Sequence, residues 1–132
     1  MATLEAARGA RGRIVLADSI TEIAEADRGC IVVSGSHGGR SAAAFALRVP
    51  LALVSFSDAG VGKDEAGIAA LALLQAAGVA AVAVAHTSAR IGDARDQWDH
   101  GIVSHANAAA HGLGIGPGQG LRDALLRSID SV

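Results

Sequence analysis

Short apolar runs alternate with Ala-rich and polar segments along this chain, and the alternation predicts strands and helices in turn. Each run is rich in Val, Ile, Leu or Ala and is bounded by turn-forming residues, which favours a buried strand. Runs that are apolar on both faces indicate a parallel sheet covered on both sides. The predicted strands are residues 13–17, 30–34, 51–55 and 79–85.

Helices are predicted in the segments between and after these strands. Residues 101–104 also fit a fifth short strand. Residues 86–100 are polar, and the charged part 93–100 is typical of a solvated surface loop or a lid. The predicted helices are residues 18–27, 41–48, 64–77, 102–112 and 121–129.

This order of elements predicts one α/β domain that covers residues 1–132. We expect a three-layer sandwich of the doubly wound type, around a mostly parallel sheet of four or five strands. Residues 1–12 carry arginines but lack the apolar stretch of a secretory signal, so they are interpreted as a lead-in to the first strand.

Composition excludes several functional classes. The net charge is −2, the pI is about 6.2 and aromatic residues make up 2% of the chain, which argues against nucleic-acid binding. Residues 67–85 are nearly long enough to span a bilayer, but Gly78 divides them into a helix and a strand, so no membrane partner is expected. The single cysteine, Cys30, opens an apolar run and fits a buried thiol in a reducing cytoplasm.

The predicted helix 64–77 has almost no polar stripe, because Ala, Leu and Ile fill it. A helix that is apolar all round must be buried all round. In so small a domain a second subunit is the simplest cover, and we therefore expect a homo-oligomer.

The loops that follow the predicted strands are polar, whereas the loops that precede them are plain. In a parallel α/β sheet the loops at the carboxyl ends of the strands line the binding crevice. This asymmetry indicates where the functional site lies. The polar loops are residues 18–21, 34–41, 57–64 and 86–93, and the plain ones are 27–29, 48–50 and 76–78.

The loop 34–41 reads Ser-Gly-Ser-His-Gly-Gly-Arg-Ser and joins a strand to a helix. Backbone N–H groups in such a turn favour an anion, and Arg40 adds positive charge. Ser36 has small neighbours and fits a loose version of a nucleophile elbow, although a plain tight turn capped by Ser41 remains an alternative. The candidate binding residues here are Gly35, His37, Gly38, Gly39 and Arg40.

Lys63 is the only lysine of the chain and stands in the glycine-rich loop 57–67. A lysine paired with a carboxylate can transfer protons, and Asp58 follows the strand directly, so both are candidate catalytic residues. The loop is not a nucleotide motif. Ser57 and Asp64 occupy the P-loop positions of Gly and Ser or Thr, and the third glycine of a dinucleotide fingerprint is missing.

The fourth polar loop supplies Ser88, Arg90 and Asp93 as candidate binding residues, with Arg90 suited to clamp a carboxylate or phosphate. His86 and His100 are possible bases. The His and carboxylate residues show no spacing typical of a metal site, so we expect neither metal nor cofactor.

Three motifs, Gly35-Ser-His-Gly-Gly39, Asp58-Ala-Gly-Val-Gly-Lys-Asp64 and Ser88-Ala-Arg-Ile-Gly-Asp93, occur together, followed by Ile102-Val-Ser-His-Ala-Asn107. In this combination the chain beyond Asp18 resembles a family of small bacterial α/β proteins. The resemblance implies that these loops form one site, and it implies no particular activity.

These observations favour a cytoplasmic, cofactor-independent enzyme that acts on a small anionic metabolite. Lys63, Asp58 and Ser36 are its candidate catalytic residues. Hydrolysis is favoured over a lyase or isomerase reaction, because Ser, His, Lys and Asp are all at hand. The alternative is a non-catalytic ligand-binding or regulatory subunit that uses the same loops.

Overall fold

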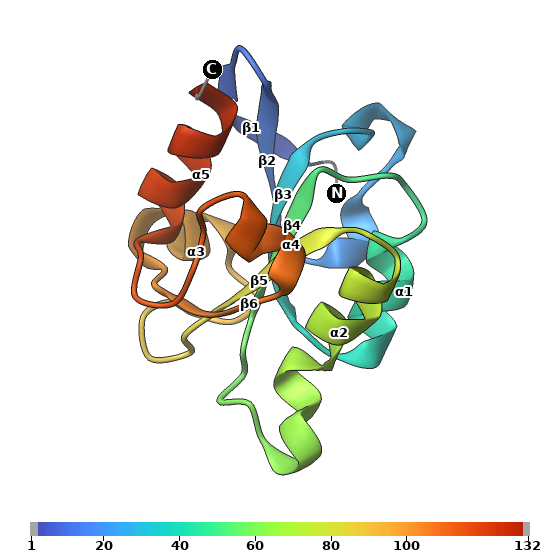
Figure 1. The fold of residues 1–132 in the computed structure, drawn as a ribbon, viewed down its shortest axis with the longest axis vertical. Coiled ribbons are helices and arrows are strands. Elements are labelled where there is room, and N and C mark those ends of the chain that lie inside the picture. Colours follow the sequence, from blue (N-terminus) through green and yellow to red (C-terminus); the bar gives the residue numbers. More distant parts are fainter. Residues whose placement is uncertain (1–2, 131–132) are drawn as a thin grey trace.

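The computed structural model describes residues 3–130 and contains a six-stranded sheet in the order β1-β2-β3-β4-β5-β6 (Figure 1). The central strands are parallel, and the edge strands β1 and β6 run antiparallel to their neighbours. The predicted α/β class with a mostly parallel sheet is confirmed, but the sheet has more strands than expected. The strands are β1 (Leu4–Gly9), β2 (Gly12–Ala17), β3 (Ile31–His37), β4 (Leu53–Ser57), β5 (Ala80–Val84) and β6 (Val103–Ala106).

Helices lie against both faces of the sheet, with α1 and α2 on one side and α3 and α5 on the other (Figure 1). Among residues 3–130, three short 3-10 helices lie in the connections that follow β2 and β4. The α-helices are α1 (Arg40–Ala46), α2 (Ala69–Ala76), α3 (Ala94–His100), α4 (Ala108–Gly112) and α5 (Leu121–Asp130), and the 3-10 helices are η1 (Ile20–Glu22), η2 (Glu25–Asp27) and η3 (Lys63–Ile68).

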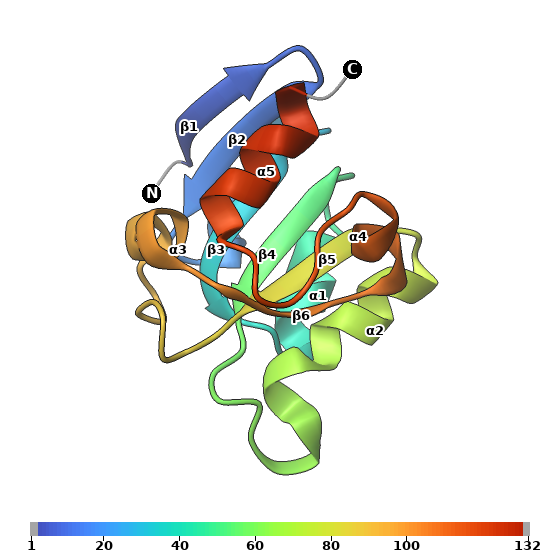
Figure 2. The ribbon, with the colours of Figure 1, turned by 60° about the vertical axis from the view of Figure 1, so that its left-hand side comes forward.

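Alternate side chains of each strand enter different cores, because a strand turns successive residues to opposite faces. Val15, Val32 and Val54 pack with α1 and α2, whereas Ile14 and Val33 pack with α3 and α5. Helix α5 lies across β1 and β2 and completes the second core (Figure 2). Its buried residues are Leu121, Ala124, Leu125 and Ile129.

The segment 1–12 contains a strand, β1, where only a lead-in was expected. Residues 1 and 2 lie outside the described range. β1 pairs with β2, while the charged side chains of Glu5 and Arg8 form an ion pair with an N–O distance of 2.8 Å. These charged residues hide the strand in the sequence, since an edge strand needs no continuous apolar run.

The polar stretch 86–100 is a loop only in its first half, because its second half forms α3. Asp93 caps this helix, and Trp98 is buried in the core despite its charged neighbours. The predicted helix 102–112 is present only as α4. Over its first half the alternative of a short strand at 101–104 is closer, because β6 forms there.

The predicted helix 64–77 begins later than expected. Asp64 and Glu65 have φ values of 56° and 58°, which belong to the left-handed region, so the α-helical backbone starts only at Ala69. Helix α2 buries Ala70, Leu71 and Leu74 on the sheet. Its other face is exposed in the single chain.

The strand order does not reverse anywhere in the sheet, so the expectation of a doubly wound sheet is wrong. The segments that connect β2 to β3, β3 to β4 and β4 to β5 all pack in the same core. They contain η1 and η2, α1, and α2, respectively. The sheet therefore lacks the switch point at which doubly wound proteins form their binding crevice. Within residues 3–130, no helix has the length and apolar character needed to cross a bilayer.

Candidate functional site

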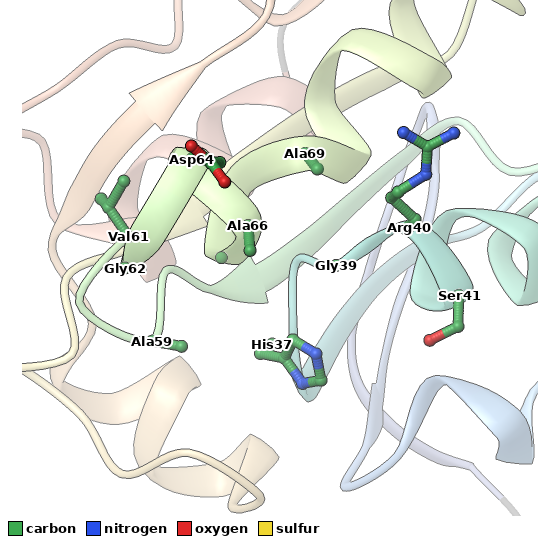
Figure 3. Close-up of a pocket in the computed structure, with 11 residues that line it drawn as sticks. His37, Gly39, Arg40, Ser41, Ala59, Val61, Gly62, Asp64, Ala66 and Ala69 are labelled. Atoms are coloured by element: carbon green, nitrogen blue, oxygen red, sulfur yellow. The ribbon is translucent and has the colours of Figure 1, made fainter.

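A pocket of about 620 Å³ opens at the carboxyl ends of β3 and β4, and we call it the loop pocket (Figure 3). It lies between the loop that leads into α1 and the segment 59–69. Methyl groups and backbone form most of its wall, and its ionisable side chains come from His37, Arg40 and Asp64. The other lining residues are Gly39, Ser41, Ala59, Val61, Gly62, Ala66, Gly67 and Ala69.

Glycines allow the two loops to touch. A Cβ atom on Gly38 would lie 2.7 Å from the carbonyl oxygen of Gly67, closer than real side chains allow. The Gly38 N–H donates to the Ser57 carbonyl at 3.0 Å, and the Ala70 N–H donates to the Gly38 carbonyl at 2.9 Å. The glycines of this motif thus serve close packing of the loops.

Arg40, His37 and Asp64 are exposed to solvent in the loop pocket. None of their side chains makes a hydrogen bond or an ion pair with any other residue of the described range 3–130. Polar side chains without protein partners can bind a ligand without first breaking a contact. The structure therefore brings Arg40, His37 and Gly39 of the first loop together with the loop that contains Lys63.

The segment 59–65 on the pocket wall has a strained backbone. Ala59 and Val61 have φ values of 51° and 68°, and Asp64 and Glu65 are also left-handed. Such values are unfavourable for residues with a Cβ atom, above all for a β-branched one. Two hydrogen bonds of 2.7 Å hold the segment, from the Val61 N–H to the Asp58 carbonyl and from the Gly67 N–H to the Val61 carbonyl. Strain of this kind is concentrated at functional sites.

Asp58 lies behind this loop, is buried, and uses both carboxylate oxygens. Oδ1 accepts hydrogen bonds from the backbone N–H groups of Gly60 at 2.8 Å and His86 at 3.0 Å, and Oδ2 accepts one from Ser104 Oγ at 2.8 Å. Nδ1 of His86 lies 3.3 Å from Oδ1. Burial, the largest single influence, would raise the pKa of Asp58, but these hydrogen bonds together outweigh it and lower the pKa.

The expected pairing of Asp58 with Lys63 is not present. Lys63 is exposed, between two residues that line the loop pocket, and its ammonium group has no ion-pair partner among residues 3–130. The hydrogen-bond donors described above surround Asp58 instead. Its position after a buried strand was predictable, but its partners were not.

Sequence reasoning also missed the pair Ser104 and His105. The single Ser104 proton is donated to the Asp58 carboxylate, so the Ser104 oxygen accepts from His105 Nδ1 at 3.0 Å. The His105 Nδ1 therefore carries a proton. No sequence spacing indicates this chain of hydrogen bonds, because Ser104 lies 46 residues from Asp58.

Ser36 lies inside β3 and outside the turn that a nucleophile elbow requires. The strand continues to His37, which pairs with Ser57. The Ser36 hydroxyl is half-buried and accepts a hydrogen bond from the Ile20 N–H at 2.9 Å, at the start of η1. Gly35 is also structural, because its carbonyl accepts the Gly92 N–H at 2.7 Å.

The residues of the fourth polar loop are mostly tied to the fold. Ser88 Oγ donates to the Ala85 carbonyl at 2.7 Å, and the Asp93 side chain caps α3 by accepting the Asp96 N–H at 3.0 Å. Arg90 is exposed, and with Ser88 it lines a separate, shallow depression of about 210 Å³. The predicted site residues are thus divided between the loop pocket, this depression and the packing of the loops.

Comparison of the chain with protein-family models, curated proteins and solved structures found no match. Within residues 3–130, no three His, Cys, Asp or Glu side chains come together in a way that could hold a metal ion. Function is therefore argued from the geometry and chemistry of the site.

Proposed function

We propose that the protein is a small-molecule enzyme that binds an anionic metabolite, bearing a carboxylate or phosphate, in the loop pocket. The observation that carries the proposal is the unpaired Arg40 guanidinium on a pocket of about 620 Å³ at the carboxyl edge of a parallel sheet. A guanidinium binds carboxylates and phosphates through two parallel hydrogen bonds. The volume falls in the usual range of small-ligand sites.

His37 is the proton-transfer group in this proposal. It lines the loop pocket and is exposed. An imidazole can serve as a general base or a general acid. For the favoured reaction, hydrolysis, His37 takes a proton from the attacking water. Ser36 is less suited to attack, because its hydroxyl lies at the start of η1. In a lyase or isomerase reaction His37 would take the proton from the substrate itself.

The strained segment 59–65 supports a function for this pocket over a purely structural role. A left-handed Val61 lowers stability, and a protein that needs no particular loop shape has no reason to retain it. Lys63 adds positive charge to the same segment and remains a candidate for proton transfer.

The alternative is a non-catalytic binding or regulatory subunit. One observation favours it: His37 has no acidic partner within residues 3–130 that would orient its ring. The same Arg40 contact would then hold the anion without turnover.

Binding and turnover of simple probes test the proposal. We expect inorganic phosphate or acetate to bind in calorimetric titration, and Arg40→Gln to weaken binding by about tenfold, the effect of losing a charge-assisted contact. Arg48→Gln, just beyond the C-terminal end of α1 and outside the loop pocket, is the matched control. With p-nitrophenyl acetate and p-nitrophenyl phosphate as chromogenic substrates, His37→Gln should lower turnover by about a hundredfold.

Three outcomes distinguish an enzyme, a binding subunit and a pocket that binds no anion. Binding that depends on Arg40, with turnover that depends on His37, supports the enzyme. Binding without turnover of either substrate favours the binding subunit. If neither anion binds, or if Arg40→Gln binds as well as Arg48→Gln, the loop pocket is not the anion site.

We further propose a three-layer scaffold, a homo-oligomer and a cytoplasmic location. The two core clusters on opposite faces of the sheet support the first. The exposed face of α2 supports the second, because Leu73 there is 37% exposed in the single chain. The buried, unpaired thiol of Cys30 supports the third.

A further inference from the structure

Two opposite charges face the loop pocket. Arg40 and Asp64 both line it, and they lie too far apart to form an ion pair with each other. In Figure 3 the methyl group of Ala69 lies between the guanidinium and the carboxylate. Each charge therefore stands at the pocket without a protein partner, on either side of a small apolar surface.

Asp64 has no structural role that would explain its carboxylate. An acidic residue at this point in the sequence fits helix capping, but η3 is capped by Gly62 and α2 begins only at Ala69. The side chain makes no hydrogen bond within the described chain. Its left-handed backbone, at φ 56°, is one that Asp tolerates better than most residues. The carboxylate is thus available to a ligand.

A ligand with only a negative charge compensates Arg40 and leaves Asp64 without a partner. Bound at Arg40, it would share the pocket with the uncompensated negative charge of Asp64. A ligand that carries both charges compensates both side chains at once. The wall between them consists of small apolar groups, Ala66 and Ala69, which suit a short aliphatic chain.

We propose that the loop pocket binds a small zwitterion, an aliphatic amino acid whose carboxylate contacts Arg40 and whose ammonium group contacts Asp64. The inference rests on the proposed function, because it names the class of anionic substrate for the same pocket. It adds Asp64 as the residue that determines specificity for an amino group.

The test compares ligands that differ only in the amino group. β-Alanine, γ-aminobutyrate and 5-aminovalerate are titrated against propionate, butyrate and valerate by calorimetry, so that chain length varies with charge held constant. For at least one length we expect the amino acid to bind about tenfold more tightly than its matched carboxylate, the scale of one charge-assisted contact.

Asp64→Asn should remove this difference while the carboxylates bind as well as before or better. The variant keeps the fold, because Asn also tolerates the left-handed backbone, and a thermal unfolding curve checks it. Asp99→Asn is the matched control, since Asp99 lies at the surface 3.9 Å from Arg122 and does not line the loop pocket. It should retain the preference for the amino acid.

The inference is overturned if the amino group adds no affinity at any length, or if its gain persists in Asp64→Asn. The proposed function then survives provided that phosphate or a carboxylate still binds through Arg40. If no ligand responds to Arg40→Gln, both proposals fail together.

Discussion

At the scale of single residues, Asp58 shows how a predicted catalytic carboxylate can serve the fold. It joins the loop after β4, the end of β5 and the start of β6 through Gly60, His86 and Ser104. The sequence places Asp58 at the carboxyl edge, because it follows an apolar run. Its partnership with Ser104 was not predictable, because it depends on β6 turning back beside β5.

Replacing the Asp58 carboxylate should destabilise the carboxyl edge of the sheet, where these hydrogen bonds lie. We expect Asp58→Asn to lower the free energy of unfolding by about 1–3 kcal/mol, because one oxygen becomes an amide that faces hydrogen-bond donors. Urea unfolding at pH 7 measures the change. Asp99→Asn is the control, since the Asp99 carboxylate lies 3.9 Å from Arg122 at the surface and should matter little.

The effect of Asp58→Asn on the free energy of unfolding should depend on pH. Folding lowers the Asp58 pKa, so the carboxylate contributes its full stability above the unfolded pKa of about 3.9 and loses it as the pH falls through the lower folded pKa. The stability difference between wild type and Asp58→Asn should therefore shrink below about pH 4. A difference that stays constant down to pH 2 would show that the ionised form is not the stabilising one.

At the scale of elements, segments with a clear apolar pattern were predictable and segments without one were not. The parallel strands β2 to β5 are continuous apolar runs, and α5 has one apolar stripe, so pattern alone indicates them. Helix α3 was missed because Trp98 is buried among charged neighbours. The predicted start of α2 was too early, because the residue types in segment 59–65 do not indicate a left-handed backbone.

The left-handed backbone at Ala59 predicts that a glycine there stabilises the protein. Ala59→Gly should raise the free energy of unfolding by about 0.5–1 kcal/mol, because relief of the left-handed strain exceeds the added entropy of the unfolded chain. Ala72→Gly, the same change inside α2, should lower it by about 0.5–1 kcal/mol. Chemical denaturation of both variants gives the two signs. Equal destabilisation would mean that Ala59 is not strained.

At the scale of the whole molecule, the exposed face of α2 bears on assembly. The sequence indicated that this helix is too apolar for solvent, and Leu73 is indeed partly exposed in the single chain. We expect sedimentation velocity at micromolar concentration to show a dimer or larger species. Leu73→Lys should shift it toward monomer, because burying an unpaired charge is unfavourable.

Ile91→Lys is the matched control. Ile91 is 55% exposed and lies in the loop before α3, away from α2, so the substitution should leave assembly unchanged. A wild-type monomer, or equal effects of the two substitutions, would contradict assembly through α2.

The docking of α5 across β1 and β2 has a consequence for biosynthesis. The strands are made before α5, yet Leu121, Leu125 and Ile129 complete the core that contains Ile14. A nascent chain stalled before residue 121 would therefore expose to chaperones and other chains the part of β1 and β2 on which α5 docks. This exposure ends when residues 121–130 have left the ribosome and α5 docks on β1 and β2.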